Sequence, residues 1–220
     1  MKPKILAIRK GILEDNDRLA YTLRTKFIKN NVFVINVVSS PGSGKTELLI
    51  VLIKQLIAKG FKVSAVVGDL ETDNDAKRLF ASGADTYQIN TNGNCHLDAR
   101  MIEKSLKNIL WQNSNILFIE NVGNLVCPAS YDLGENIRMV VLSTTEGEDK
   151  PLKYPTMFNS ADVCVISKMD LADAVEFDEK TAVQNVHNVS PDIKLFKTSA
   201  KKDLGIRELL DSIVSLIPSK

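Results

Sequence analysis

The sequence predicts a single α/β domain with a mostly parallel sheet covered by helices on both faces. Apolar, strand-like runs alternate with helical patterns, and this alternation is typical of a parallel sheet with crossover helices. The length of 220 residues suits one such unit with a sizeable core. The first strand-like run ends in a glycine-punctuated turn, which places a ligand loop at the carboxyl end of a strand. The predicted strands are 33–38, 62–67, 116–120, 138–143, 162–167 and 194–198.

Helices are predicted before, between and after these strands. An amphipathic pattern over 16–29 lies within an N-terminal helical extension, 1–30, which we expect to pack on the remaining domain, 31–220. An apolar pattern over 47–59 predicts the helix after the glycine turn, and the pattern over 205–217 predicts the last helix. Two polar segments are predicted to be surface loops: 108–115 and 143–155.

The turn after the first strand has the sequence of a phosphate-binding loop, which predicts a P-loop NTPase. The stretch from Val32 to Thr46 reads VFVINVVSSPGSGKT, with Ser39 where the written pattern has glycine. Glycine lets several backbone N–H groups converge on a triphosphate at a helix N-terminus. Lys45 brings a positive charge to the β and γ oxygens and is a predicted catalytic residue, while the Thr46 hydroxyl is placed to ligate Mg²⁺. The predicted nucleotide-binding residues of this loop are Gly42, Ser43, Gly44, Lys45 and Thr46.

A segment after the strand 162–167 predicts that the base is guanine. It reads Ser167-Lys168-Met169-Asp170 and resembles the guanine-specificity motif Asn-Lys-x-Asp. The carboxylate of Asp170 can accept hydrogen bonds from both the ring N–H and the amino group of guanine, and the alkyl stem of Lys168 can cover the base. Ser167 in place of Asn is expected to weaken one polar contact and to relax guanine selectivity.

A second guanine-reading segment follows the last predicted strand. It reads TSAK and resembles the segment whose backbone reads the guanine carbonyl oxygen, with Ser199 and Ala200 as the binding residues. Two such segments in the expected order, each after a strand, favour GTP over ATP. A small-molecule kinase with the same phosphate loop is the alternative, although the sequence shows no acceptor-pocket or lid signal.

Acidic residues at two strand ends predict the magnesium site and the water-positioning group. Glu120 ends the third predicted strand, and Gly123 follows with an N–H that can meet the γ-phosphate. In the acidic run GDLETDND, we predict that Asp69 is catalytic and positions water, and that Asp75 contacts Mg²⁺. The predicted magnesium ligands are Thr46, Asp75 and Glu120. Two further carboxylates of the run are left without a role: Glu71 and Asp73. Phosphoryl transfer depends on positioning and charge neutralisation, so we expect a slow GTPase completed by dimerisation or a partner.

Two cysteines and a histidine form a candidate metal site. Cys95 and His96 are adjacent in a loop-like segment, and Cys127 lies just beyond Gly123. Two thiolates and an imidazole suit Ni²⁺ or Zn²⁺, and three ligands leave a position for water, a partner's thiolate or a second subunit. Free thiols are the other interpretation of this spacing. Movement of the Gly123 segment with the γ-phosphate would couple the nucleotide state to metal affinity. Cys164, within a strand, is interpreted as a small buried apolar residue.

Composition and charge exclude several classes of function. The formal net charge is +1 with mixed signs throughout, which gives no electrostatic reason to expect nucleic acid. No apolar run approaches the length of a membrane span, and the first residues lack a signal-peptide pattern, so we expect no membrane association and a cytoplasmic location. Three cysteines do not indicate a disulfide framework.

Taken together, these segments resemble one family across essentially the whole chain: the nickel-incorporation GTPases of hydrogenase maturation, known as HypB. The resemblance rests on SSPGSGKT, GDLETDNDAKR, the NCH segment, ENVGNLVCP, EGEDKPLKYP and SKMD. It implies a GTPase that forms a homodimer with nucleotide and binds Ni²⁺ or Zn²⁺ through Cys95, His96 and Cys127 near the dimer interface. It also implies nickel transfer towards a [NiFe] hydrogenase large-subunit precursor with a HypA-type partner.

The sequence lacks two features found in some members of this family, and two other functions remain as alternatives. Some members carry a cysteine-rich N-terminal nickel site or a histidine-rich stretch, and this sequence has neither, so high-affinity capture by a monomer and bulk storage are not expected. The related urease-maturation GTPase would carry a Cys-Pro-His motif, whereas Cys127-Pro128 is followed here by Ala129. A non-hydrolysing, metal-responsive binding module, in which GTP only gates association, is the rival from another class.

Overall fold

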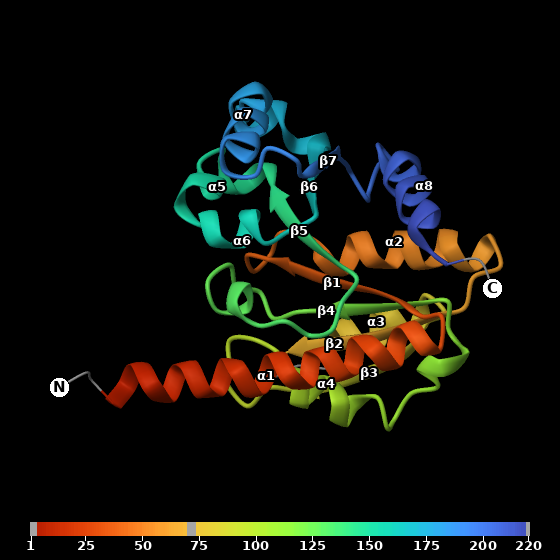
Figure 1. Ribbon diagram of the computed structural model, residues 1–220. Helices are drawn as coiled ribbons and strands as arrows, with labels where there is room; N and C mark the ends of the chain where they lie inside the picture. The colour runs from red at the N-terminus through yellow and green to blue at the C-terminus, as the bar shows by residue number, and fades with distance from the viewer. Residues whose placement is uncertain (1–3, 70–73, 219–220) are drawn as a thin grey trace.

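The computed structural model describes residues 4–69 and 74–218 and contains a seven-stranded sheet with helices on both faces (Figure 1). The strand order is β3-β2-β4-β1-β5-β6-β7, and every neighbouring pair is parallel. The predicted α/β fold is therefore confirmed, with a sheet that is parallel throughout. The strands are β1 (Phe33–Ser39), β2 (Val63–Asp69), β3 (Asp85–Asn90), β4 (Ile116–Glu120), β5 (Ile137–Ser143), β6 (Val163–Ser167) and β7 (Lys194–Lys197).

Strand β3 was not among the strands predicted from the sequence. It reads DTYQIN, and none of its side chains is fully buried. It lies at the edge of the sheet and pairs only with β2, so it needs no continuous apolar run of the kind that marks the central strands. Its position matters for the site, because the segment with Cys95 and His96 begins where β3 ends.

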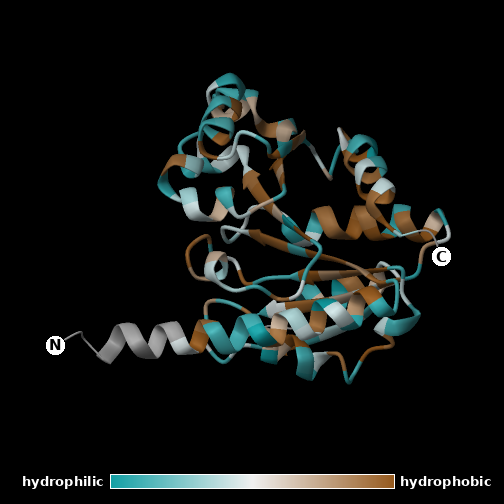
Figure 2. Ribbon diagram, in the orientation of Figure 1, coloured by the Kyte–Doolittle hydropathy of each residue, from teal (hydrophilic) through white to brown (hydrophobic). Residues whose placement is uncertain are grey.

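Alternate residues of the central strands contact helices on opposite faces. Phe33 and Ile35 of β1 pack in one apolar cluster, whereas Val34 between them packs in another. The central strands are largely apolar, whereas the helices carry both polar and apolar residues (Figure 2). The helices over one face are α2 (Lys45–Ala58), α3 (Asn74–Ala81) and α8 (Ile206–Leu216). Those over the other are α1 (Lys4–Lys29), α4 (Ala99–Ser105), α6 (Pro155–Asn159) and α7 (Glu179–Val189), with α5 (Lys150–Lys153) beside α7.

The two predicted surface loops are more structured than the sequence suggested. Segment 108–115 contains a 3-10 turn over Trp111–Asn113, in which Trp111 is buried. Segment 143–155 contains a second 3-10 turn, Thr144–Glu146, together with α5, and both Thr144 and Pro151 are buried. In each case a few side chains inside a polar segment anchor it to the core, a feature that mean polarity does not reveal.

Helix α1 is longer than the predicted 16–29 and packs on the sheet through one face. Ala20, Leu23 and Phe27 are fully buried there. The ring of Phe27 meets that of Trp111 edge to face, with the centroids 5.3 Å apart. The proposed boundary between 1–30 and 31–220 stays a prediction. Within the described ranges, no helix combines the length and apolar character needed to cross a membrane.

Replacing Phe27 with alanine should strongly destabilise the protein, because the change removes a fully buried ring and leaves a cavity against Trp111. We expect a loss of about 3–5 kcal/mol in the free energy of unfolding, measured by urea denaturation. Tyr21 of the same helix is 70% exposed, so Tyr21→Ala is the matched control, with an expected change within about 0.5 kcal/mol. Equal effects of the two changes would contradict the packing role of α1.

Candidate functional site

The phosphate loop connects β1 with α2 and is shaped by two glycines. Gly42 and Gly44 have φ values of 73° and 91°, the left-handed region that glycine adopts without strain. Lys45, the first residue of α2, is buried, and its Nζ donates a hydrogen bond of 2.8 Å to Ser39 Oγ. Burial lowers the pKa of Lys45, while Glu120 raises it. The departure from the written motif at Ser39 therefore supplies an acceptor for the loop lysine.

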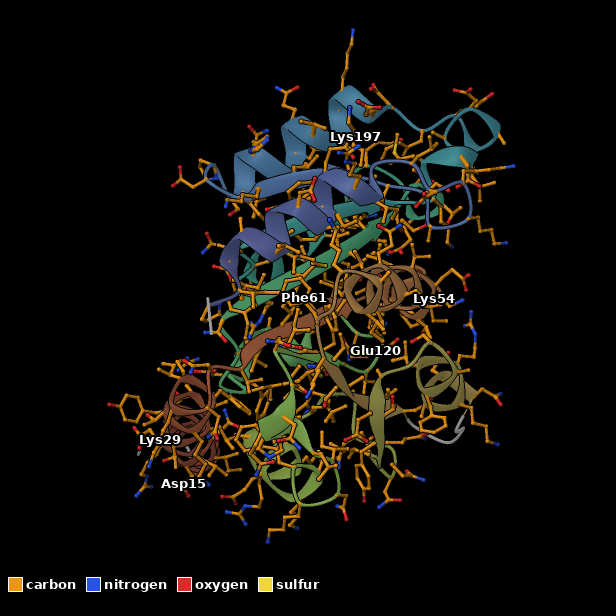
Figure 3. All side chains as sticks on the ribbon, turned by 90° about the vertical axis from the view of Figure 1, so that its right-hand side faces the viewer. Asp15, Lys29, Lys54, Phe61, Glu120 and Lys197 are labelled. Atoms are coloured by element: carbon orange, nitrogen blue, oxygen red, sulfur yellow. The ribbon has the colours of Figure 1, made fainter. Side chains whose placement is uncertain are left out.

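Thr46 and Glu120, two of the predicted magnesium ligands, are in direct contact. The Thr46 hydroxyl donates a hydrogen bond of 2.7 Å to Glu120 Oε1. Glu120 is only 3% exposed, and burial raises its pKa to about 7, against the opposing effect of Lys45. Figure 3 shows it inside the molecule, whereas Lys29 and Lys197 lie at the periphery. Its other oxygen, Oε2, is buried and has no hydrogen-bond partner in the described part of the chain. A hydroxyl and carboxylate oxygens are the donor set that a hard cation such as Mg²⁺ takes.

A cavity of about 410 Å³ lies in front of the phosphate loop. Asp69, Asp75, Glu120 and Gly123 all line it, so the structure brings these predicted residues together. Gly123 lies directly against the loop, since a Cβ atom there would come within 2.9 Å of Pro41 Cα. Glu71 and Asp73 lie outside the described residues.

Arg78 of α3 also lines this cavity and was missed by the sequence analysis. Its guanidinium contacts the Glu47 carboxylate, and its Nη1 lies 3.5 Å from Asp75 Oδ1. Arginine offers planar donors that match phosphate oxygens, so this residue adds a cation to the phosphate cavity. The only signal in the sequence was its place at the end of the segment GDLETDNDAKR.

A second pocket, of about 230 Å³, lies beside the loop between the two predicted guanine-reading segments. Lys168, Asp170, Ser199 and Ala200 line it, together with Gly44. Lys168 has a left-handed backbone with φ 58°, and its Nζ donates a hydrogen bond of 2.7 Å to the Gly42 carbonyl. The hydroxyl of Ser199 donates to Asp170 Oδ1 over 2.5 Å and so orients the carboxylate of the predicted base-reading residue.

Ser167 contacts the phosphate loop. Its hydroxyl is buried and donates a hydrogen bond of 2.7 Å to the Ser43 carbonyl in the phosphate loop. The substitution of Asn by Ser therefore places a link between the base-reading segment and the phosphate loop. The expected loss of a polar contact to the base stays a prediction.

The three candidate metal ligands converge although Cys95 and Cys127 are 32 residues apart. Cys127 begins a 3-10 turn, Cys127–Ser130, and its Sγ lies 2.6 Å from Cys95 Sγ. The His96 Nδ1 is 3.8 Å from Cys95 Sγ, and the three ligand atoms lie within 4.8 Å of one another. The hydrogen bond with Cys127, together with burial, raises the pKa of the Cys95 thiol. Two sulfur atoms and one imidazole nitrogen form a donor set for a soft or borderline cation.

The imidazole of His96 is held in place by an aromatic neighbour. Its ring stacks on Tyr131, with centroids 3.9 Å apart and an interplanar angle of 23°. Burial lowers the pKa of His96, which favours the neutral form that ligates metals. Cys164, by contrast, is fully buried in β6 and lies outside this cluster. His187 is exposed.

Comparisons with known proteins agree with this arrangement. A family model described as "CobW/HypB/UreG, nucleotide-binding domain" matches residues 33–197. The chain is 44% identical to the hydrogenase maturation factor HypB of Azotobacter chroococcum over 207 residues, which cover 94% of this chain and 68% of the relative. It is 45% identical to the hydrogenase/urease maturation factor HypB of Helicobacter hepaticus, with 97% and 88% covered.

A solved structure resembles the whole molecule. HypB from Helicobacter pylori, crystallised in complex with nickel, superposes with a TM-score of 0.86 at 39% sequence identity. The match covers 91% of this chain and 94% of that one. The family model, the two relatives and the superposed structure all indicate the same family. The chain belongs to the CobW/HypB/UreG family of nucleotide-binding domains and, within it, to the HypB maturation factors.

Proposed function

We propose that the protein is a GTP-hydrolysing metallochaperone that binds Ni²⁺ or Zn²⁺ and assists nickel insertion during [NiFe] hydrogenase maturation. One observation carries this proposal: the segment that leaves β4 reaches both sites. It begins at Glu120 beside Thr46, passes Gly123 against the phosphate loop and reaches Cys127 next to Cys95. A shift of this segment with the nucleotide state would move a metal ligand.

The phosphate cavity supports hydrolysis by positioning and charge. The loop amides and Lys45 hold the phosphates, and the N–H of Gly123 meets the γ-phosphate. Thr46, Glu120 and Asp75 would hold Mg²⁺, directly or through its water, and the ion would supply positive charge against the negative charge that develops during phosphoryl transfer. Asp69 positions the attacking water. Because phosphoryl transfer depends on positioning and charge neutralisation, we expect turnover to be slow until a second subunit or a partner completes the site.

Guanine selectivity is assigned to the second pocket. The carboxylate of Asp170, oriented by Ser199, accepts the two guanine N–H groups, and the stem of Lys168 covers one face of the base. The backbone at Ser199 and Ala200 reads the carbonyl oxygen. A small-molecule kinase would need an acceptor site next to the γ-phosphate, whereas four carboxylates that suit a cation and its water line the phosphate cavity, beside the loop backbone, Lys45 and Arg78.

The metal cluster supplies three ligands, which leaves one position for water, a partner's thiolate or a second copy of the chain. Dimerisation with nucleotide, transfer through a HypA-type partner and delivery to a hydrogenase large-subunit precursor in the cytoplasm complete the proposal. Its support is the HypB membership together with the cluster geometry. The Helicobacter hepaticus relative is named for both hydrogenase and urease, so the recipient enzyme is the part of the proposal that needs a direct test.

Replacing Asp170 with asparagine should change the preferred base. The amide of asparagine presents a donor where guanine also has a donor. We expect kcat/KM for GTP hydrolysis to fall by about 10- to 100-fold, because hydrogen bonds to a charged acceptor are lost. Hydrolysis of xanthosine triphosphate should rise, because xanthine carries a carbonyl in place of the amino group. Asp173→Asn, at an exposed carboxylate three residues on, is the control, and Lys45→Ala gives the background rate. An unchanged preference in Asp170→Asn would refute this assignment.

Replacing Cys127 with alanine should remove the metal site. We expect Ni²⁺ and Zn²⁺ binding by the wild type in calorimetric titration, with an affinity that differs between GDP and a non-hydrolysable GTP analogue. Cys127→Ala should lose this binding because only one thiolate and one imidazole remain. Cys164→Ala is the matched control and should bind as the wild type does, since Cys164 is buried within β6. Equal stoichiometry in Cys127→Ala and the wild type would rule out the cluster.

Metal binding should become tighter as the pH rises. The pKa of Cys95 is raised above its ordinary value by the hydrogen bond with Cys127, so at neutral pH the thiol holds its proton and the metal must displace it. We expect about one or more protons to be released per Ni²⁺, measured at pH 7 by calorimetry in buffers of different ionisation enthalpy. A binding enthalpy independent of the buffer would show that the ligands are already deprotonated.

A further inference from the structure

We propose that Asn121 is the positioning residue that couples the nucleotide site to the Cys95–His96–Cys127 cluster. This inference rests on the function proposed above and names the side chain through which the two sites act on each other. Asn121 stands between Glu120, the partner of Thr46, and Gly123, which lies against the phosphate loop. It is 1% exposed and lines the phosphate cavity.

The first connection from Asn121 leads to the segment that carries Cys95 and His96. Asn121 Oδ1 accepts a hydrogen bond of 3.2 Å from the backbone N–H of Leu97, the residue after His96. The same oxygen accepts one of 2.9 Å from the N–H of Val122 on the way to Gly123. The side-chain oxygen of Asn121 is therefore bonded both to the residue that follows His96 and to the residue that precedes Gly123.

Leu97 is itself fixed between the two sites. Its side chain is fully buried and packs onto the backbone of Gly68, where a Cβ atom would come within 2.8 Å of Leu97 Cδ2. Gly68 precedes Asp69, the predicted water-positioning residue of the same cavity. A displacement of the Leu97 backbone is thus opposed by packing on one side and by the Asn121 hydrogen bond on the other.

The second connection leads from Asn121 to the turn that carries Cys127. Asn121 Nδ2 donates to Asn36 Oδ1 over 3.3 Å, and Asn36 Nδ2 donates to Glu135 Oε1 over 3.0 Å. Glu135 forms a buried ion pair with Arg138, at 2.9 Å. Arg138 Nη1 donates to the Ala129 carbonyl over 3.2 Å, and Nη2 donates to that of Tyr131 over 2.8 Å.

Both connections end beside metal ligands. Ala129 lies within the turn Cys127–Ser130, Tyr131 follows that turn, and the Tyr131 ring stacks on His96. Buried polar groups keep their partners because an unmade hydrogen bond in the interior is costly. When Gly123 shifts to meet the γ-phosphate, the side-chain amide of Asn121 shifts with it. Leu97 and Asn36 then have to follow, or their hydrogen bonds with Asn121 break and leave buried polar groups unpaired. The positions of the sulfur and nitrogen ligands therefore follow the nucleotide.

The test measures the ratio of Ni²⁺ affinities between two nucleotide states in the full chain. Ni²⁺ alone is titrated by calorimetry into protein loaded with Mg²⁺ and either GDP or a non-hydrolysable GTP analogue. We expect the ratio in the wild type to be about fivefold or more, the lower end of typical couplings. Asn121→Ala should bring it within about twofold of one while both nucleotides and Ni²⁺ still bind. Asn36→Ala, which removes only the second connection, should lower the ratio part of the way.

Ser64→Ala is the matched control, because it also removes a buried hydrogen bond, the 2.6 Å contact between Ser64 and Ser114, where β2 and β4 begin and away from their carboxyl ends. Its ratio should equal that of the wild type. A wild-type ratio retained in Asn121→Ala overturns the inference, and so does a ratio of one in the wild type, although Ni²⁺ binding by the proposed function would then still stand. If Asn121→Ala does not fold, an unchanged ratio in Asn36→Ala overturns it. Absence of Ni²⁺ binding in the wild type would instead refute the proposed function itself.

Discussion

The pairing of β4 with β1 is the interaction on which the rest of the site depends. Its register sets Val37 opposite Glu120, and the N–H of Asn121 extends the ladder by donating to the Val37 carbonyl over 3.0 Å. Because β1 leads into the phosphate loop two residues later, this register brings Glu120 to the start of α2, where Thr46 meets it. A slip by one residue would turn the carboxylate to the other face of the sheet. One backbone ladder thus positions Glu120 beside Thr46, Gly123 against the phosphate loop and the path towards Cys127.

The buried charges in this region organise the molecule more than they stabilise it. Arg138 and Glu135 have side chains only 9% and 7% exposed. Withdrawing two charges from water offsets most of their attraction, so such a pair contributes little net stability compared with apolar side chains of the same volume. The pair instead fixes the position of the Cys127 turn, since the guanidinium of Arg138 donates to the carbonyls of Ala129 and Tyr131. Glu120 is also buried, beside Lys45, and its burial disfavours the charged form of the carboxylate. A bound cation would stabilise that charged form.

The parts of the site that the sequence could predict are those whose chemistry is local. The phosphate loop, Lys168 and Asp170 each belong to a short motif with a fixed spacing, and the structure places all of them around two adjoining pockets. Strand β3 escaped prediction because only Tyr87 and Ile89 of its six residues pack against the core, which does not give a continuous apolar run. The approach of Cys95 to Cys127 depends on how β3 and β4 are arranged in the sheet, which spacing does not encode. Asn121 and Arg138 likewise gain their roles from partners far away in the chain.

The burial of Cys164 makes its thiol less reactive than the other two thiols of the protein. Cys164 is fully buried in β6, and burial raises its pKa to about 12, so it is a poor nucleophile in the folded state. Cys95 and Cys127 lie in surface loops and remain partly exposed. An alkylating reagent therefore modifies at most two of the three cysteines until the domain unfolds. A cation held by those two sulfur atoms would shield them, so the number of alkylated cysteines, read by mass spectrometry, reports metal occupancy and global unfolding as separate steps.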